Sequence, residues 1–222
     1  VKDRASLWNV PEFSANFFRR VFSEIFCGSK LTKMKKIFVV ISVLTLVACG
    51  SSRNTASEDK FVIENLQRYS SEELKREYPD ANFREDVGMF EEGTVERAYT
   101  ILYPDTPNEL HVTWKDKSRT GIHDIRFDVG GQWKSAEGIK IGTTYDELNR
   151  LNEKEISFYG FGWDYSGAVM WNDGKLENSG LRVFLGPRND PGNKFYGDRL
   201  IEASPEEIDA LDLRVETIML MN

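Results

Sequence analysis

Cysteine and histidine are both scarce in this chain, with two of each among its 222 residues. The cysteines, Cys27 and Cys49, both lie before residue 50, so the long C-terminal part of the chain has no thiol. That part can form no disulfide, and a zinc site built from cysteines is excluded there. The histidines, His111 and His123, form no metal-binding motif with each other, so the sequence predicts no metal site.

Long apolar runs are scarce too, and the clearest one is Ile37–Ala48, which follows the basic start Met34–Lys36. As a helix this run would be about 18 Å long, whereas the hydrocarbon core of a bilayer is about 30 Å thick. A short apolar run between a basic start and a small-residue end is typical of a cleaved targeting segment. The alternative, a buried core helix, needs polar residues at helical spacing, and only Ser42 and Thr45 interrupt the run.

Leu46-Val47-Ala48-Cys49 completes the pattern, and residues 34–50 resemble the signal of a bacterial lipoprotein. The resemblance implies that residues 34–48 are a signal peptide and that Cys49 carries diacylglycerol and an amide-linked acyl chain such as palmitate. More than one acyl chain anchors a protein stably to a membrane. Gly50 follows the cysteine where an inner-membrane retention signal has aspartate. We therefore expect an envelope lipoprotein on the periplasmic face of the outer membrane.

Residues 1–33 precede this signal, although a signal peptide belongs at the start of a chain. We interpret them as upstream sequence included by a start codon assigned too early. The alternative is a real amphipathic extension, because Phe13–Phe26 has aromatic residues at helix-like spacing. N-terminal sequencing of the natural product distinguishes the two.

The charge of the remaining chain is strongly negative. Residues 1–48 hold eight Lys/Arg and three Asp/Glu, so their removal takes the net charge from −7 to −12. Nucleic acid is therefore not an expected partner, since a phosphate backbone requires clustered cations. An acidic surface also avoids anionic lipid, which suits a domain held at a membrane by its acyl chains alone.

Residues 49–58 are small and polar, so we expect them to form a flexible tether. Residues 59–222 predict one α+β domain, mainly an antiparallel sheet with short helices on one face. Ser-x-x-Glu or Thr-x-x-Glu capping boxes start three of the expected helices. The expected helices are Asp59–Arg68, Ser70–Tyr78, Thr144–Leu151 and Ser204–Leu211. The expected strands are Phe83–Phe90, Thr94–Tyr103, Glu109–Lys115, Ile122–Val129, Ile156–Tyr159, Gly167–Trp171, Gly180–Leu185 and Leu213–Leu220.

Alternation along two of these strands places the histidines. His111 lies opposite Trp114 and is expected at the surface, whereas His123 is predicted to share a face with Ile125 and Phe127 and to be half-buried. Asn172-Asp173-Gly174 predicts a tight turn between two later strands.

Gly138–Asn152, GIKIGTTYDELNRLN, resembles the strand and capped helix at the start of small envelope lipoproteins of the SmpA/OmlA type. The order of helices and strands is also similar to the β-lactamase-inhibitor-protein-like architecture. The resemblance implies two helix-plus-strands repeats and a protein that binds other proteins without catalytic residues. This chain departs from those families in its longer strands and aromatic insertions.

Candidate chemistry is sparse. Ser166 lacks the first glycine of a G-x-S-x-G nucleophile motif, so no catalytic residue is assigned. Asn189–Asn193 offers oxygen ligands for calcium, but its spacing fits no EF-hand and its composition is that of an ordinary turn. We predict no metal and no cofactor.

Residues 158–167, FYGFGWDYSG, hold five aromatic side chains interleaved with glycines. One interpretation makes them a hairpin that fills the core, with glycines allowing close packing. The other makes them exposed anchors for a partner or a sugar. The candidate binding residues of this aromatic stretch are Tyr159, Phe161, Trp163, Asp164 and Tyr165.

Two functions follow from these observations. The first is a non-catalytic binding or assembly module that acts on another envelope protein. The alternative is a small-ligand binder or hydrolase that uses the aromatic stretch as a wall. The hydrolase predicts a pocket with His111 or His123 beside a carboxylate.

Overall fold

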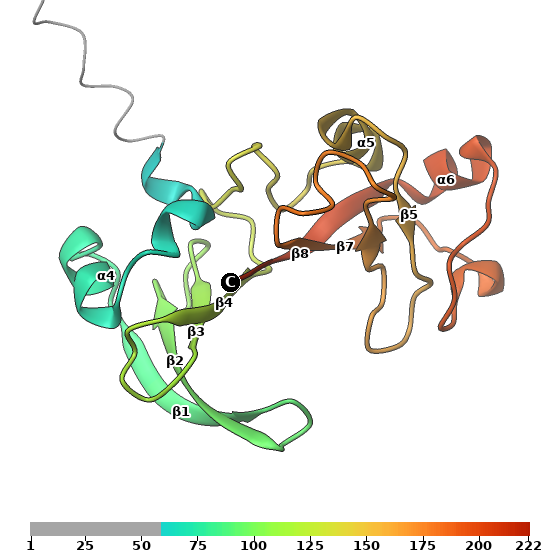
Figure 1. The fold of residues 1–222 in the computed structure, drawn as a ribbon. Helices are drawn as coiled ribbons and strands as arrows, with labels where there is room; N and C mark the ends of the chain where they lie inside the picture. The colour runs from blue at the N-terminus through green and yellow to red at the C-terminus, as the bar shows by residue number, and fades with distance from the viewer. Residues whose placement is uncertain (1–58) are drawn as a thin grey trace, which may run out of the picture. The chain divides into compact units, whose positions relative to one another are not determined.

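The structure is a computed structural model that describes residues 59–222. The predictions for Cys49, the signal segment and the tether lie outside the described residues. An antiparallel sheet in the order β1-β2-β3-β4-β8-β7 dominates the fold, beside a small sheet of β5 and β6, so the α+β prediction is confirmed (Figure 1). The strands are β1 (Arg84–Phe90), β2 (Val95–Leu102), β3 (Leu110–Trp114), β4 (Ile122–Phe127), β5 (Ser157–Phe158), β6 (Val169–Met170), β7 (Leu181–Pro187) and β8 (Leu213–Met221).

Three α-helices begin where the capping boxes predict: α4 (Ser71–Glu77), α5 (Tyr145–Asn152) and α6 (Pro205–Leu211). In each helix the N-cap hydroxyl accepts the backbone N–H of a glutamate, whose carboxylate accepts the N–H of the cap. That second bond holds the pKa of Glu73 and of Glu147 below the usual range. Figure 1 shows α4 beside β1–β4 and α5 and α6 beside β5 and β7.

The expected helix Asp59–Arg68 is instead two 3-10 helices, η1 (Asp59–Phe61) and η2 (Ile63–Leu66). Between them Val62 is extended, because this segment pairs with Lys134. The Ile63 N–H donates to the Lys134 carbonyl over 3.1 Å, and the Lys134 N–H donates to the Phe61 carbonyl over 3.0 Å. This distant pairing overrides the local helical pattern. A third 3-10 helix, η3, covers Asn193–Phe195.

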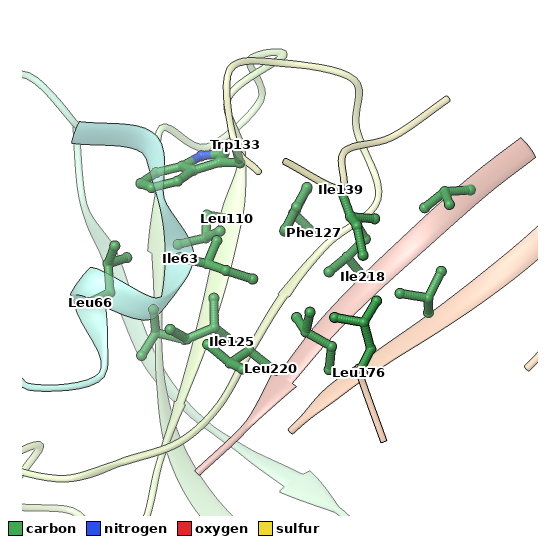
Figure 2. Packing of buried hydrophobic residues seen from close by; sticks show 14 of the residues in the cluster. Ile63, Leu66, Leu110, Ile125, Phe127, Trp133, Ile139, Leu176, Ile218 and Leu220 are labelled. Carbon is green, nitrogen blue, oxygen red and sulfur yellow. The ribbon is translucent and has the colours of Figure 1, made fainter. Parts of the chain in front are cut away.

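The core covers one face of the large sheet. Figure 2 shows η2 and the loop that carries Trp133 over the apolar side chains of the central strands. The Trp133 indole is buried and donates through Nε1 to the Asn108 carbonyl over 2.8 Å. A fully buried apolar side chain contributes about 1.5–3 kcal/mol. The residues labelled in Figure 2 are Ile63, Leu66, Leu110, Ile125, Phe127, Trp133, Ile139, Leu176, Ile218 and Leu220.

A β-bulge in β4 corrects the prediction for His123. Thr113 pairs with Asp124 but Trp114 pairs with Ile122, so His123 is the extra residue on its strand. The bulge lets both Ile122 and Ile125 face the core. The bulge takes His123 out of the alternation with Ile125 and Phe127, although the residue is half-buried as expected; its Nδ1 contacts the Asp124 carboxylate at 2.8 Å.

The other face of the large sheet carries a row of register partners, one from each strand. Successive strands contribute these six residues, and we call the surface that they mark the open face. The row consists of Arg84, Ile101, His111, Arg126, Met219 and Arg182. Ile101 is buried yet lies outside the core cluster, because it belongs to this second face.

The strands expected at Ile156–Tyr159 and Gly167–Trp171 shorten to the two-residue strands β5 and β6. The turn at Asn172-Asp173-Gly174 is confirmed, since the first two residues have φ values of 55° and 58° and the Gly174 N–H donates to the Trp171 carbonyl. It does not make a hairpin of β6 and β7, because β6 pairs with β5 and only the bridge Ala168–Phe184 reaches β7. Within residues 59–222 no helix has the length and apolar character needed to cross a bilayer.

Candidate functional site

The aromatic stretch is divided between the core and the surface. Phe158 and Phe161 are buried and belong to the core cluster, as the packing interpretation predicts. Trp163 is half-buried, and Tyr165 is 56% exposed. Each interpretation of the sequence therefore holds for different residues of the same stretch.

Backbone hydrogen bonds fix the loop from Gly160 to Gly167, which we call the aromatic loop. The Gly160 N–H donates to the Arg199 carbonyl over 2.9 Å, and the Phe161 N–H donates to the Phe195 carbonyl over 2.8 Å. On the other side, the Leu185 N–H of β7 donates to the Gly167 carbonyl over 2.8 Å. The loop is thus held between residues 195–199, from the end of η3 onward, and the edge of the large sheet.

Glycine is required where the aromatic loop meets β7. Gly167 has a φ of 70°, and a Cβ built there would lie 1.9 Å from the Leu185 carbonyl oxygen. No side chain fits at that distance, so only glycine lets the two backbones approach closely enough to bond.

Three rings of the stretch contact one another in sequence. The centroids of Tyr159 and Trp163 lie 5.6 Å apart at 66°, and those of Trp163 and Tyr165 lie 5.3 Å apart at 60°. The Trp163 indole donates through Nε1 to the Gly160 carbonyl over 2.8 Å, which fixes the orientation of the middle ring. Edge-to-face and tilted contacts of this kind add about 0.5–1.5 kcal/mol per pair.

The three rings line a cavity of about 680 Å³, which we call the aromatic cavity. This volume is within the range of about 300–1,000 Å³ found for ligand sites. At its rim Met170 is 41% exposed and adds a flexible apolar surface beside Tyr165. The lining residues are Tyr159, Trp163, Tyr165, Ala168, Val169, Met170, Trp171, Glu177, Gly180, Leu181, Arg182, Val183, Phe184, Asp198 and Met221.

A second cavity of about 540 Å³ is lined by Phe161, Asp164 and Tyr165 together with residues of β7 and β8. The structure therefore places Tyr159 and Trp163 in the aromatic cavity and Phe161 and Asp164 in the second one. Tyr165 lines both cavities. A third cavity of about 440 Å³ lies between α5, β5 and α6 and contains none of the five predicted binding residues.

Three charged side chains line the aromatic cavity. Glu177 accepts the Asp173 N–H over 3.2 Å, so one of its oxygens is engaged. Among the described residues, neither Arg182 nor Asp198 has a side-chain hydrogen bond or ion pair in this structure. An uncommitted guanidinium beside aromatic and apolar walls provides an orienting polar group for a ligand.

The histidines lie elsewhere. His111 contacts the Glu109 carboxylate at 2.8 Å, and His123 contacts Asp124, which also accepts from the Thr113 hydroxyl over 3.3 Å. Neither histidine lines any of the three cavities described above. Ser166 accepts the Gly162 N–H over 3.1 Å within the aromatic loop. The histidine-lined pocket that a hydrolase predicts is therefore not found at the aromatic stretch.

No three acidic or histidine side chains converge to hold a metal ion within residues 59–222. The segment Asn189–Asn193, considered for calcium, makes turn contacts instead. The Gly192 N–H donates to the Asp190 carboxylate over 3.0 Å, and the Asn189 amide donates to the Ala210 carbonyl over 2.8 Å. The first bond is that of an ordinary turn, and the second ties the segment to α6.

Sequence reasoning missed Arg182, Met170, Phe184 and Met221 as members of the site. One signal was available, because Arg182 and Phe184 alternate with the buried Leu181 and Val183. A phenylalanine on the polar side of a strand indicates a covered surface. Met221 carried no such signal, since it reaches the cavity through strand pairing.

No family model matches this chain, and no curated protein matches it. Among solved structures, it is similar to the crystal structure of the uncharacterized protein yfeY from Escherichia coli. That likeness has a TM-score of 0.40 and 15% identity and covers 67% of this chain and 88% of that chain. A likeness of this size carries no argument about fold or function.

Proposed function

We propose that this protein is a non-catalytic binding module whose recognition site is the aromatic cavity with its rim. The observation that carries the proposal is the division of one aromatic stretch between core and surface. Phe158 and Phe161 fix the stretch in the core, and Trp163 and Tyr165 are presented at a cavity. Large aromatic side chains held in place in this way are the usual anchors of binding surfaces, because little conformational entropy is lost when they bind.

The lipoprotein signal supplies the proposed location. We propose that the mature chain begins at a lipidated Cys49 and that residues 49–58 tether the domain to the periplasmic face of the outer membrane. A tethered domain meets membrane-bound partners at a high effective concentration, so that a modest affinity suffices for assembly.

We also propose that the domain is a tandem of two helix-plus-strands units, α4 with β1–β4 and α5 with β5–β8. The strand order supports this proposal. The last strands of the two units, β4 and β8, pair with each other, and β3 and β7 flank them. The Ala168–Phe184 bridge then brings β6 next to β7, as β2 lies next to β3. In this plan the aromatic loop takes the place of the turn between β1 and β2.

Site-specific photo-cross-linking in native membranes tests the proposed function. A cross-linking side chain at Tyr165 is expected to capture one defined envelope protein. The same group at Met89, which is 60% exposed on the β1–β2 hairpin, is the matched control and is expected to capture none. Adding Trp163→Ala should abolish the Tyr165 product, because the middle ring of the cavity wall is removed. Equal products from both positions, or a Tyr165 product that survives Trp163→Ala, would refute the proposal.

A further inference from the structure

Arg182 differs from every other arginine that the structure describes. Residues 59–222 contain eleven arginines, and each of the other ten has a hydrogen bond or an ion pair. Arg188, seven residues from the start of β7, is 3.8 Å from the Glu216 carboxylate, for example. Arg68 and Arg199 donate to a tyrosine hydroxyl and a backbone carbonyl, and the other eight lie within 4 Å of a carboxylate, so among the described arginines Arg182 alone has no such partner. Its guanidinium is available to a ligand.

Strand alternation directs Arg182 toward the ligand space. Leu181 and Val183 on either side are buried in the core, so Arg182 projects on the opposite side of β7, where it lines the aromatic cavity. Its register partner on β8 is Met219, and Met221 of the same strand lines the cavity as well. A cation thus stands at the border between the apolar cavity and the open face.

A planar guanidinium with five N–H donors matches a carboxylate in a bidentate arrangement. Apolar side chains form the larger part of the cavity around it, from Val169, Met170, Phe184 and Met221 as well as the three rings. Apolar walls favour an aliphatic or aromatic group next to the carboxylate, because the hydroxyl groups of a sugar acid would have to give up water to lie against them. Asp198 provides an acceptor for a neighbouring amide N–H.

We propose that Arg182 binds the C-terminal carboxylate of a peptide or protein chain whose last residue is apolar, with that side chain in the aromatic cavity. This inference rests on the proposed function, because it specifies the ligand of the same site. Capture of a chain end by charge and a pocket is an established mode of peptide recognition. It restricts the partner to a protein with a free, apolar C-terminus.

Isothermal titration of the full chain in detergent with acetyl-Gly-Phe tests the proposal, with acetyl-Gly-Phe-amide as the matched ligand. The free acid is expected to bind at least about tenfold more tightly than the amide, as for a charge-assisted bidentate pair. Arg182→Gln should remove this preference, whereas Arg182→Lys should retain part of it. Lysine keeps the positive charge but lacks the planar guanidinium that binds a carboxylate through two hydrogen bonds. Arg188→Gln, an arginine outside the aromatic cavity, is the control and should leave the preference unchanged.

The outcomes separate this inference from the proposed function. Equal binding of acid and amide, or a preference that survives Arg182→Gln, overturns the role of Arg182 and leaves an apolar binding cavity. Binding of galacturonic acid but of neither peptide assigns the site to sugar acids instead and overturns the peptide. If no probe binds while Tyr165 still cross-links its partner, the carboxylate inference fails and the binding module stands. Unchanged thermal unfolding of Arg182→Gln verifies that the variant is folded, because this exposed side chain has no partner to lose.

Discussion

Gly167→Ala tests whether the contact between the aromatic loop and β7 holds the site together. An alanine Cβ at this position would lie 1.9 Å from the Leu185 carbonyl oxygen and 2.9 Å from its carbon, so the loop must move away from β7. That movement breaks the 2.8 Å bond from the Leu185 N–H to the Gly167 carbonyl. Leaving this buried donor unpaired costs about 1–3 kcal/mol. The left-handed backbone, with a φ of 70°, adds about 1–2 kcal/mol for a residue with a Cβ.

The expected destabilisation is therefore about 2–5 kcal/mol, measured by urea denaturation of the full chain in detergent. Gly138→Ala is the matched control, because Gly138 has a φ of 89° but no heavy atom within 4 Å of the place that an added Cβ would occupy. Gly138→Ala should lower the free energy of unfolding only by the backbone contribution of about 1–2 kcal/mol. Gly167→Ala should also weaken binding of acetyl-Gly-Phe, whereas Gly138→Ala should not. Equal losses of stability for the two variants would refute the reasoning.

Two further predictions concern hydrogen-bonded polar side chains. Burial tends to raise the pKa of Glu85, but hydrogen bonds from Ser71 and Lys75 outweigh it and hold the pKa below its ordinary value of 4.5. This carboxylate therefore stabilises the fold above about pH 4.5, and the stabilisation is lost as the pH falls through the lowered pKa. Solvent screens this partly exposed group, so Glu85→Gln should lower the free energy of unfolding by only about 0.5–1 kcal/mol at pH 7 and by much less at pH 3. Urea denaturation at the two pH values measures both losses, and equal losses would contradict the reasoning. The buried Trp114 indole donates to the Thr100 hydroxyl over 2.8 Å, so Thr100→Val should cost about 1–3 kcal/mol by leaving the indole unpaired. A double-mutant cycle with Trp114→Phe checks this, and additive losses would show that the bond contributes nothing.

The helices were predictable from sequence because their signals are local. Each capping box joins residues three apart, so Ser70 and Thr144 predict the starts of α4 and α5 without information from the rest of the chain. The segment Asp59–Arg68 illustrates the limit, since Lys134, about seventy positions away, turns a helical pattern into an extended bridge at Val62. His123 illustrates it again, because a single bulge in β4 reverses which side chains face the core.

The candidate site was predictable only in part. The density of aromatics and glycines singled out residues 158–167, and three of the five predicted residues, Tyr159, Trp163 and Tyr165, line the aromatic cavity. Nothing in the local pattern could assign Phe161 to the core and Tyr165 to the surface. That division depends on the backbone bonds to Phe195 and Leu185, which come from distant segments.

The sequence by itself determined the α+β class, the helix starts, the alternation of most strands and the absence of thiols after Cys49, because each depends on composition or on residues a few positions apart. Only the tertiary structure decided that β8 pairs with β4, that Met221 joins the aromatic cavity, and that Arg182 has no carboxylate partner. These features depend on which distant segments lie side by side. Strand pairing across the chain sets that arrangement, and the local pattern of hydrophobic residues does not encode it.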